Sequence, residues 1–256
     1  MWDPFSTTET YLLRTLRMPD KVFAMDASPV YAPMTGAVPL EDDTPRLVVA
    51  MAGRAVHVYD LRALRHAIYS GAPESAFAPA QRRESSLKFM LRDVRCMPDG
   101  TGYATSSVEG RIAVEFFDTS AAAQAQKYAF KCHRREVDGV DVVYPIHAMA
   151  FHPLYGTFAS AGGDAHCALW DPVAKKRIRQ YVLPSPLSAA CFNATGEVLA
   201  LASGAVNLED ANHDGPDAGE VGGIGAGGHG HVKLHIKPAL EAVSYTHLTL
   251  PTICSV

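Results

Sequence analysis

The sequence lacks several features that mark whole classes of protein. No apolar run approaches the roughly 18–20 residues that a membrane-spanning helix needs, so we expect no membrane partner. The five cysteines are scattered and form no Cys-x-x-Cys pair, which argues against a disulfide framework or a zinc ribbon and favours a reducing compartment. Lys and Arg number 23 against 27 Asp and Glu, and without a basic excess we expect no direct nucleic-acid binding. The opening MWDPFSTTET has no charged segment followed by an apolar one, so we expect no secretory signal.

The chain does have enough apolar residues for a buried core. It has 256 residues, 48% of them hydrophobic and 20% charged, which suits one large domain or two small ones. An aromatic residue followed by aspartate recurs at nearly equal spacing, at Trp2-Asp3, Tyr59-Asp60, Phe117-Asp118 and Trp170-Asp171. The last three pairs each end an alternating run, at 55–60, 111–118 and 166–171, and such alternation indicates β-strands. A further alternating run, HVKLHI, covers 231–236.

Each repeat reads as four short strands joined by turns rich in Gly, Pro and Asp. In the third repeat we expect these strands at 146–152, 157–161, 166–171 and 177–183. Four-stranded units whose third strand ends in Trp-Asp are typical of WD-repeat β-propellers. We therefore predict an all-β fold, a partial WD-repeat β-propeller of about four blades out of an expected seven. The repeats exceed the usual ~40–45 residues, and we expect the excess in loops at 62–81 and 206–230.

The two ends of the sequence suggest domain boundaries. Trp2-Asp3 would close a blade whose earlier strands are absent, so we expect residues 1–242 to be a partial propeller without its N-terminal blades. A complete ring of four blades is the alternative. Residues 243–256 resemble translated cloning sequence, and we expect a non-native tail there. Because an open ring leaves sheet edges unpaired, we expect the chain to be poorly soluble or prone to aggregate.

Four segments carry a resemblance to a known family. QRRESSLK (81–88), SSVEGRIAVEFFD (106–118), KYAFKCHR (127–134) and ALWDPVAKKR (168–177) resemble the third member of the budding-uninhibited-by-benzimidazole group, the WD-repeat propellers of the spindle assembly checkpoint. The sister family, the nuclear-pore mRNA-export propellers, shares FKCHR and EGR, and AFHPLYGTFAS (150–160) is closer to that sister. The resemblance implies a non-enzymatic adaptor without cofactors, located in the nucleus at kinetochores. Its implied partners are checkpoint kinases with GLEBS motifs and a phosphorylated kinetochore scaffold with phosphothreonine MELT repeats.

Basic residues are predicted to meet at one rim of the second complete blade. Counting across the expected hairpin places Arg111 opposite Lys131, and Arg92 starts a strand near the turn before Arg111. Converging cations suit a phosphate or a carboxylate, and the alternative is a solvated basic edge. The resemblance implies that Arg111 and Lys131 face the phosphothreonine, that Arg92 faces an acidic GLEBS residue, and that His133 and Arg134 extend the phosphopeptide patch.

Three residues of the third repeat are predicted to be structural. By analogy with other WD repeats, Asp164 in its turn should hydrogen-bond back into the blade, with Trp170 packed beside it and Ser160 joining them. The histidine of the usual Gly-His pair is missing before the first strand of this repeat, so we expect the network to be incomplete.

Other motifs do not support an enzyme. GIGAGG at 223–228 matches a dinucleotide fingerprint but follows no strand and opens no helix, which predicts a flexible loop. No carboxylate or cysteine is well placed to complete a metal site with the C-terminal histidines His213, His229, His231 and His235. No nucleophile stands in a recognisable catalytic context, so we predict no catalytic residues; an enzyme on a propeller scaffold remains the third alternative.

Overall fold

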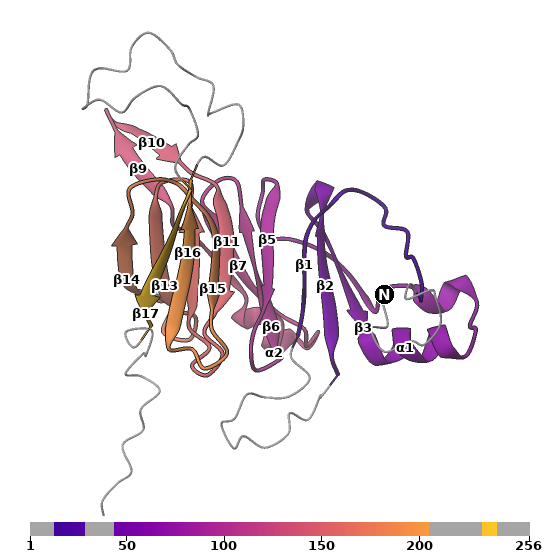
Figure 1. Ribbon diagram of the computed structural model, residues 1–256. Coiled ribbons are helices and arrows are strands. Elements are labelled where there is room, and N and C mark those ends of the chain that lie inside the picture. Colours follow the sequence, from indigo (N-terminus) through magenta and orange to yellow (C-terminus); the bar gives the residue numbers. More distant parts are fainter. Residues whose placement is uncertain (1–12, 29–43, 205–231, 240–256) are drawn as a thin grey trace, which may run out of the picture. The chain divides into compact units, whose positions relative to one another are not determined.

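The computed structural model describes residues 13–28, 44–204 and 232–239 (Figure 1). Trp2-Asp3, the 206–230 loop, the GIGAGG segment and the 243–256 tail all lie outside the described residues. Within these residues the protein is mostly β, and no helix combines the length and apolar character needed to cross a membrane.

Three sheets have four strands each, ordered as they follow in the chain. Such antiparallel meanders are consistent with propeller blades. The first sheet contains β1 (Val22–Ala27), β2 (Arg46–Met51), β3 (Ala55–Asp60) and β4 (Gln81–Glu84). The second contains β5 (Leu91–Cys96), β6 (Gly102–Ser107), β7 (Arg111–Phe116) and β8 (Tyr128–Lys131). The third contains β11 (Ile146–Phe151), β12 (Phe158–Gly162), β13 (His166–Asp171) and β14 (Lys176–Val182).

Two smaller sheets complete the described strands. A three-stranded sheet contains β15 (Leu187–Phe192), β16 (Val198–Ser203) and β17 (Lys233–Pro238). A separate hairpin pairs β9 (Arg134–Val137) with β10 (Val140–Val143). Asp138 and Gly139 join these two strands with φ of 51° and 77°, as the favoured two-residue hairpin turn requires. The four strands predicted for the third repeat are confirmed almost residue for residue, whereas the β9–β10 hairpin was not foreseen.

The expected loop at 62–81 is instead partly helical. Helix α1 (Leu61–Tyr69) begins directly after β3, and a 3₁₀ helix covers Glu74–Phe77. The Asp60 carboxylate accepts hydrogen bonds from the backbone N–H groups of Arg62 and Ala63, which caps α1 at its N-terminus. Two other short helices are α2 (Ala121–Gln126) and the 3₁₀ turn Ala52–Arg54. The described residues are thus mostly β, as predicted, with short helices in the connections between strands.

The protein divides into two compact units, each with its own core. One comprises Met1–Thr105 with Ala113–Ala129, and the other comprises Ser106–Ile112 with Phe130–Val256. In the second unit, alternate residues of β11, β12, β15 and β16 turn toward one another and form a core that includes Ala159, Leu187, Leu199 and Leu201. This packing explains the period-2 pattern, because side chains at alternate positions of a strand share one face.

His152, at the end of β11, should make folding sensitive to mild acid. The ring is 2% exposed, and its Nδ1 accepts hydrogen bonds from the backbone N–H groups of Leu154 and Tyr155, both at 3.2 Å. Burial lowers the pKa of His152 below its usual 6.5, and a backbone hydrogen bond with Gly196 opposes only part of that effect. The unfolded chain therefore binds the proton more readily, and the free energy of unfolding falls as pH drops through about 6.5.

The expected result is a lower urea midpoint near pH 5.5 than near pH 7.5, with a smaller difference in His152→Asn. Asparagine keeps an acceptor oxygen but does not titrate. Some slope should remain in the variant, because burial also lowers the pKa of His57 in the first unit. An unchanged pH dependence in His152→Asn would contradict the assignment.

Candidate functional site

The predicted opposition of Arg111 and Lys131 agrees with the backbone geometry. The N–H of Cys132 donates to the carbonyl of Gly110 at 2.8 Å, and β7 and β8 are neighbours in their sheet. In an antiparallel ladder, this bond places Arg111 opposite Lys131. Two cations therefore face each other at the start of β7 and the end of β8.

A single nearby carboxylate only partly offsets this charge. Glu109 Oε2 lies 3.5 Å from Arg111 Nε, a distance that is long for a charge-assisted hydrogen bond. The other carboxylate oxygen of Glu109 and the Nε of Arg111 are both buried and have no hydrogen-bond partner. Lys131 is exposed and has no ion pair with any carboxylate in the described residues. The pair keeps a positive excess that an anionic ligand can neutralise.

Arg134 is held more firmly than Arg111. One guanidinium nitrogen donates to the carboxylate of Asp141 on β10, and another donates to the backbone carbonyl of Glu109. Its side chain is 20% exposed. These contacts connect the β9–β10 hairpin to the turn before β7. The guanidinium group of Arg134 is therefore engaged within the protein, where it positions the two segments.

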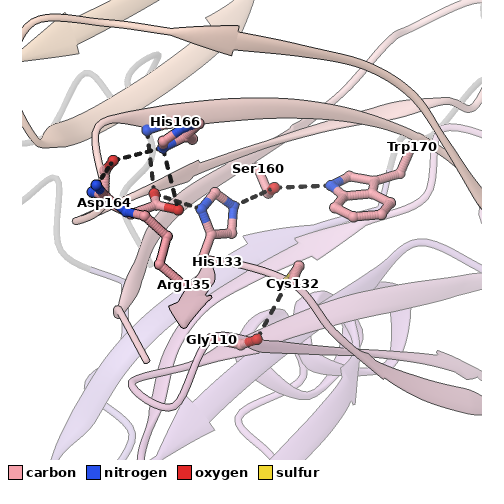
Figure 2. Close-up of polar contacts among 8 residues, drawn as sticks. All are labelled: Gly110, Cys132, His133, Arg135, Ser160, Asp164, His166 and Trp170. Atoms are coloured by element: carbon pink, nitrogen blue, oxygen red, sulfur yellow. Dashed lines mark hydrogen bonds and ion pairs between the residues drawn. The ribbon is translucent and has the colours of Figure 1, made fainter. Parts of the chain in front are cut away.

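His133 lies in a buried hydrogen-bonded chain with three structural residues (Figure 2). Its Nδ1 is 2.8 Å from the Asp164 carboxylate, and its Nε2 is 2.7 Å from the Ser160 hydroxyl. The Trp170 indole N–H donates to that same hydroxyl at 2.9 Å. With the proton on Nδ1, the donors run in one direction, from Trp170 through Ser160 and His133 to Asp164. We refer to these four residues as the tetrad.

The expectation of an incomplete network was wrong, and the position of His133 explains why. The usual position of this histidine is directly before β11, but the β9–β10 hairpin separates His133 from that strand. The backbone N–H of Tyr144 donates to the carbonyl of His133 at 3.0 Å and closes the base of the hairpin. His133 therefore takes the place of the missing histidine. Because it is 5% exposed and both ring nitrogens are engaged, it is not available to a phosphopeptide. The signal for the hairpin was the Val-Asp-Gly-Val sequence at 137–140.

Asp164 is the acceptor at the end of the tetrad. Burial opposes its ionisation, but hydrogen bonds from the His133 ring and the backbone N–H of His166 outweigh burial and hold the pKa of the carboxyl below its usual value. The backbone carbonyl of Asp164 accepts from His166 Nδ1 at 2.6 Å and from Arg135 at 3.3 Å (Figure 2). Asp164, in the turn before β13, is therefore held in its ionised form.

The Cys132 thiol, which directly precedes His133 in the chain, is not a reactive one. Burial raises the pKa of the Cys132 thiol, beside the tetrad, to about 12, which keeps it protonated and a poor nucleophile near neutral pH. The described ranges contain no cluster of three His, Cys, Asp or Glu residues that could hold a metal ion.

Arg92 belongs to the first unit. It lies in β5 with its side chain exposed. Its convergence with Arg111 and Lys131 stays a prediction.

Comparison with known proteins gives the family. No protein-family profile matches the chain. It is 46% identical over 220 residues to the mitotic checkpoint protein BUB3.1 of Arabidopsis thaliana, an alignment that covers 85% of this chain and 57% of that protein. It is 41% identical over 197 residues to mitotic checkpoint protein bub3 of Dictyostelium discoideum, covering 77% of this chain and 52% of the relative. The chain is a Bub3 homologue.

Both of these Bub3 relatives are mitotic checkpoint proteins. The mRNA-export proteins are more distant relatives: the poly(A)+ RNA export protein of Schizosaccharomyces pombe is 33% identical over 202 residues, which cover 78% of this chain and 48% of that protein. The chain spans about half the length of the curated relatives that it matches.

Proposed function

We propose that this chain is the ligand-binding part of a non-enzymatic WD-repeat adaptor of the spindle assembly checkpoint, acting in the nucleus at kinetochores. Its sheets would be blades of a partial propeller within residues 1–242. The observation that carries the proposal is the opposed pair of Arg111 and Lys131 in a Bub3 homologue. The proposed ligand of this pair is a phosphothreonine of a MELT-type repeat on a phosphorylated kinetochore scaffold.

Phosphothreonine suits this pair chemically. It carries roughly −1.5 to −2 charges and three strong acceptor oxygens at neutral pH. An arginine offers a planar fork to such a group and a lysine offers a compact charge. The phosphate would also relieve the repulsion between the two cations, which Glu109 offsets only in part.

A second ligand is proposed for Arg92. Its exposed side chain on β5 would pair with an acidic residue of a GLEBS motif carried by the checkpoint kinases. The identity to checkpoint proteins, 46% and 41%, exceeds the 33% and 34% identity to mRNA-export proteins, which supports checkpoint kinases over nuclear-pore partners.

Binding of synthetic peptides tests the proposal. We expect the chain to bind a phosphothreonine MELT-type peptide at least tenfold more tightly than the unphosphorylated peptide, in fluorescence polarisation at fixed salt. Arg111→Ala and Lys131→Ala should each weaken phosphopeptide binding about tenfold, since each removes a charge-assisted contact worth roughly 1.4 kcal/mol. Neither change should alter binding of the unphosphorylated peptide.

Arg92→Ala is the reciprocal control. It removes one cation as the other two variants do, but it should weaken binding of a GLEBS peptide and leave the MELT-type phosphopeptide unaffected. Equal affinity of the unmodified protein for phosphorylated and unphosphorylated peptides would refute the phosphothreonine assignment.

A further inference from the structure

Helix α1 (Figure 1) has an exposed side with a distinctive set of residues. Its buried residues, Leu64 and Ala67, pack into the core of the first unit, which includes Phe77 of the following 3₁₀ helix. Its large exposed residues have the i, i+3, i+4, i+7 spacing that places side chains on one side of a helix. They are Arg62, Arg65, His66 and Tyr69, and we refer to them as the α1 face.

The α1 face, together with Ser70, lines a hollow of about 510 Å³ that has no acidic lining residue in the described part of the chain. The two carboxylates that flank α1 in the sequence are already bound, because Asp60 caps the helix and Glu74 forms an ion pair with an arginine outside it. Arg65 has no ion pair within the described ranges, and its guanidinium carbon lies 5.9 Å from the centre of the Tyr69 ring. The whole chain has more acidic than basic residues, 27 against 23, so composition does not explain this concentration of cations.

The helix that carries this face is held in place at both ends. At its N-terminus the Asp60 side chain accepts two backbone N–H groups. At its C-terminus Gly71 has a φ of 64°, and the backbone N–H of Ala72 donates to the carbonyl of Ala67 at 3.0 Å, which closes a Schellman motif. A ligand therefore meets a preformed surface, and no segment has to become ordered on binding.

Stabilisation of the helix explains only part of this arrangement. Cations near the C-terminal end of a helix interact favourably with its dipole, which accounts for Arg65 and His66. The dipole does not account for the ring of Tyr69, which is 63% exposed. Tyrosine and arginine are both enriched where proteins bind one another, so an exposed tyrosine beside an arginine without an acidic partner favours a binding surface.

We propose that the α1 face binds an acidic peptide segment of another protein, one with an apolar side chain next to its carboxylates. Arg65 binds a carboxylate through its planar guanidinium group, and His66 adds a ring N–H as a second donor. The Tyr69 ring covers the apolar side chain. The α1 face belongs to the first unit, whereas Arg111 and Lys131 belong to the second, so this surface is separate from the proposed phosphothreonine site.

A peptide suits the α1 face better than a nucleic acid does. The helix has nine residues and is therefore about 13 Å long, which matches a short peptide segment. The net charge of the chain is −4, which disfavours the approach of a long polyanion but has less effect on a peptide with a few carboxylates. The hollow also offers an aromatic ring to an apolar side chain, which a phosphate backbone lacks.

Short synthetic peptides test the proposal. The probe is a fluorescein-labelled peptide of sequence EEFEE, compared with EEAEE, QQFQQ and single-stranded oligo(dT) by fluorescence polarisation at fixed low salt. The protein is the 256-residue chain carrying Lys131→Ala, which reduces binding of acidic peptides at the proposed phosphate site. We expect EEFEE to bind about fivefold more tightly than QQFQQ and about threefold more tightly than EEAEE.

Two variants of the α1 face and one control locate the binding. Arg65→Gln should weaken EEFEE binding about three- to tenfold and leave QQFQQ binding unaffected. Because glutamine is a good helix former, the circular dichroism and urea midpoint of this variant should not change. Tyr69→Ser should weaken binding of EEFEE but not of EEAEE, which has no ring. Arg17→Gln is the matched control, since it removes an exposed arginine of the first unit that does not line the hollow.

The outcomes separate this surface from the phosphothreonine site. Weaker EEFEE binding in Arg65→Gln but not in Arg17→Gln supports the proposal. Equal binding of EEFEE and QQFQQ, or equal losses in the two variants, refutes it. Tighter binding of oligo(dT) than of EEFEE, with the same dependence on Arg65, overturns the peptide in favour of a nucleic acid. With Lys131 intact, Arg65→Gln should bind the MELT-type phosphopeptide normally, so either assignment can fail without the other.

Discussion

Replacing Asp164 with alanine is expected to lower the free energy of unfolding by about 3 kcal/mol, because it leaves one buried and one partly buried donor without acceptors. These are the Nδ1–H of His133 and the backbone N–H of His166, which both bond to one oxygen of the Asp164 carboxylate. Asp164 and His133 are each 5% exposed, so water cannot readily replace the lost acceptor. Urea denaturation followed by circular dichroism measures the change.

Asp99→Ala is the matched control for this experiment. Asp99 also accepts from the backbone N–H two residues later, that of Thr101 at 3.0 Å, but it is exposed and has no histidine partner. The loss expected there is below about 1 kcal/mol. Similar losses in the two variants would mean that the tetrad adds nothing beyond the aspartate turn.

Gly110→Ala is expected to cost about 2–4 kcal/mol of stability and to weaken phosphopeptide binding as well. Gly110 has a φ of +65°, and a Cβ there would lie 2.6 Å from the carbonyl oxygen of His133 and 3.0 Å from that of Tyr144. Both neighbours are backbone atoms, so the turn or the base of the hairpin must move. Since Arg111 follows Gly110 directly, its alignment with Lys131 would be lost. Urea denaturation and peptide binding on the same variant measure the two effects.

Gly139→Ala separates backbone strain from this collision. Gly139 also has a positive φ, of +77°, but a Cβ there meets nothing within 4 Å. We expect a cost of only about 1 kcal/mol and unchanged peptide binding. If Gly110→Ala lowered the stability no more than Gly139→Ala, the close approach of the turn to His133 would not contribute to the cost of the substitution.

The strands of the third repeat could be predicted because local signals agree there. Alternation marks each strand from β11 to β14, and Gly, Pro or Asp marks each turn. In the 62–81 region the same approach failed, because alanines and prolines suggested a loop. The Asp60 side chain and two buried residues of α1, Leu64 and Ala67, support a helix there instead.

The candidate site was predictable where it depends on strand register. Counting residues outward from one hairpin turn was enough to predict that Arg111 lies opposite Lys131. In an antiparallel ladder, the position of the turn determines which residues of the two strands are paired. The count could not show that Glu109 approaches Arg111, or that Arg134 is tied to Asp141. Those contacts depend on side-chain conformations and on the position of the β9–β10 hairpin.

The residue pattern alone established a β-rich repeat chain with checkpoint-family motifs and an opposed basic pair, since periodicity and motif spacing are local properties. The role of His133 was settled by folding, which brings residues 133, 160, 164 and 170 together around an inserted hairpin. Burial and long-range hydrogen bonds form only when separate strands meet, so no local pattern could reveal that a histidine grouped with the ligand-binding residues belongs to the interior.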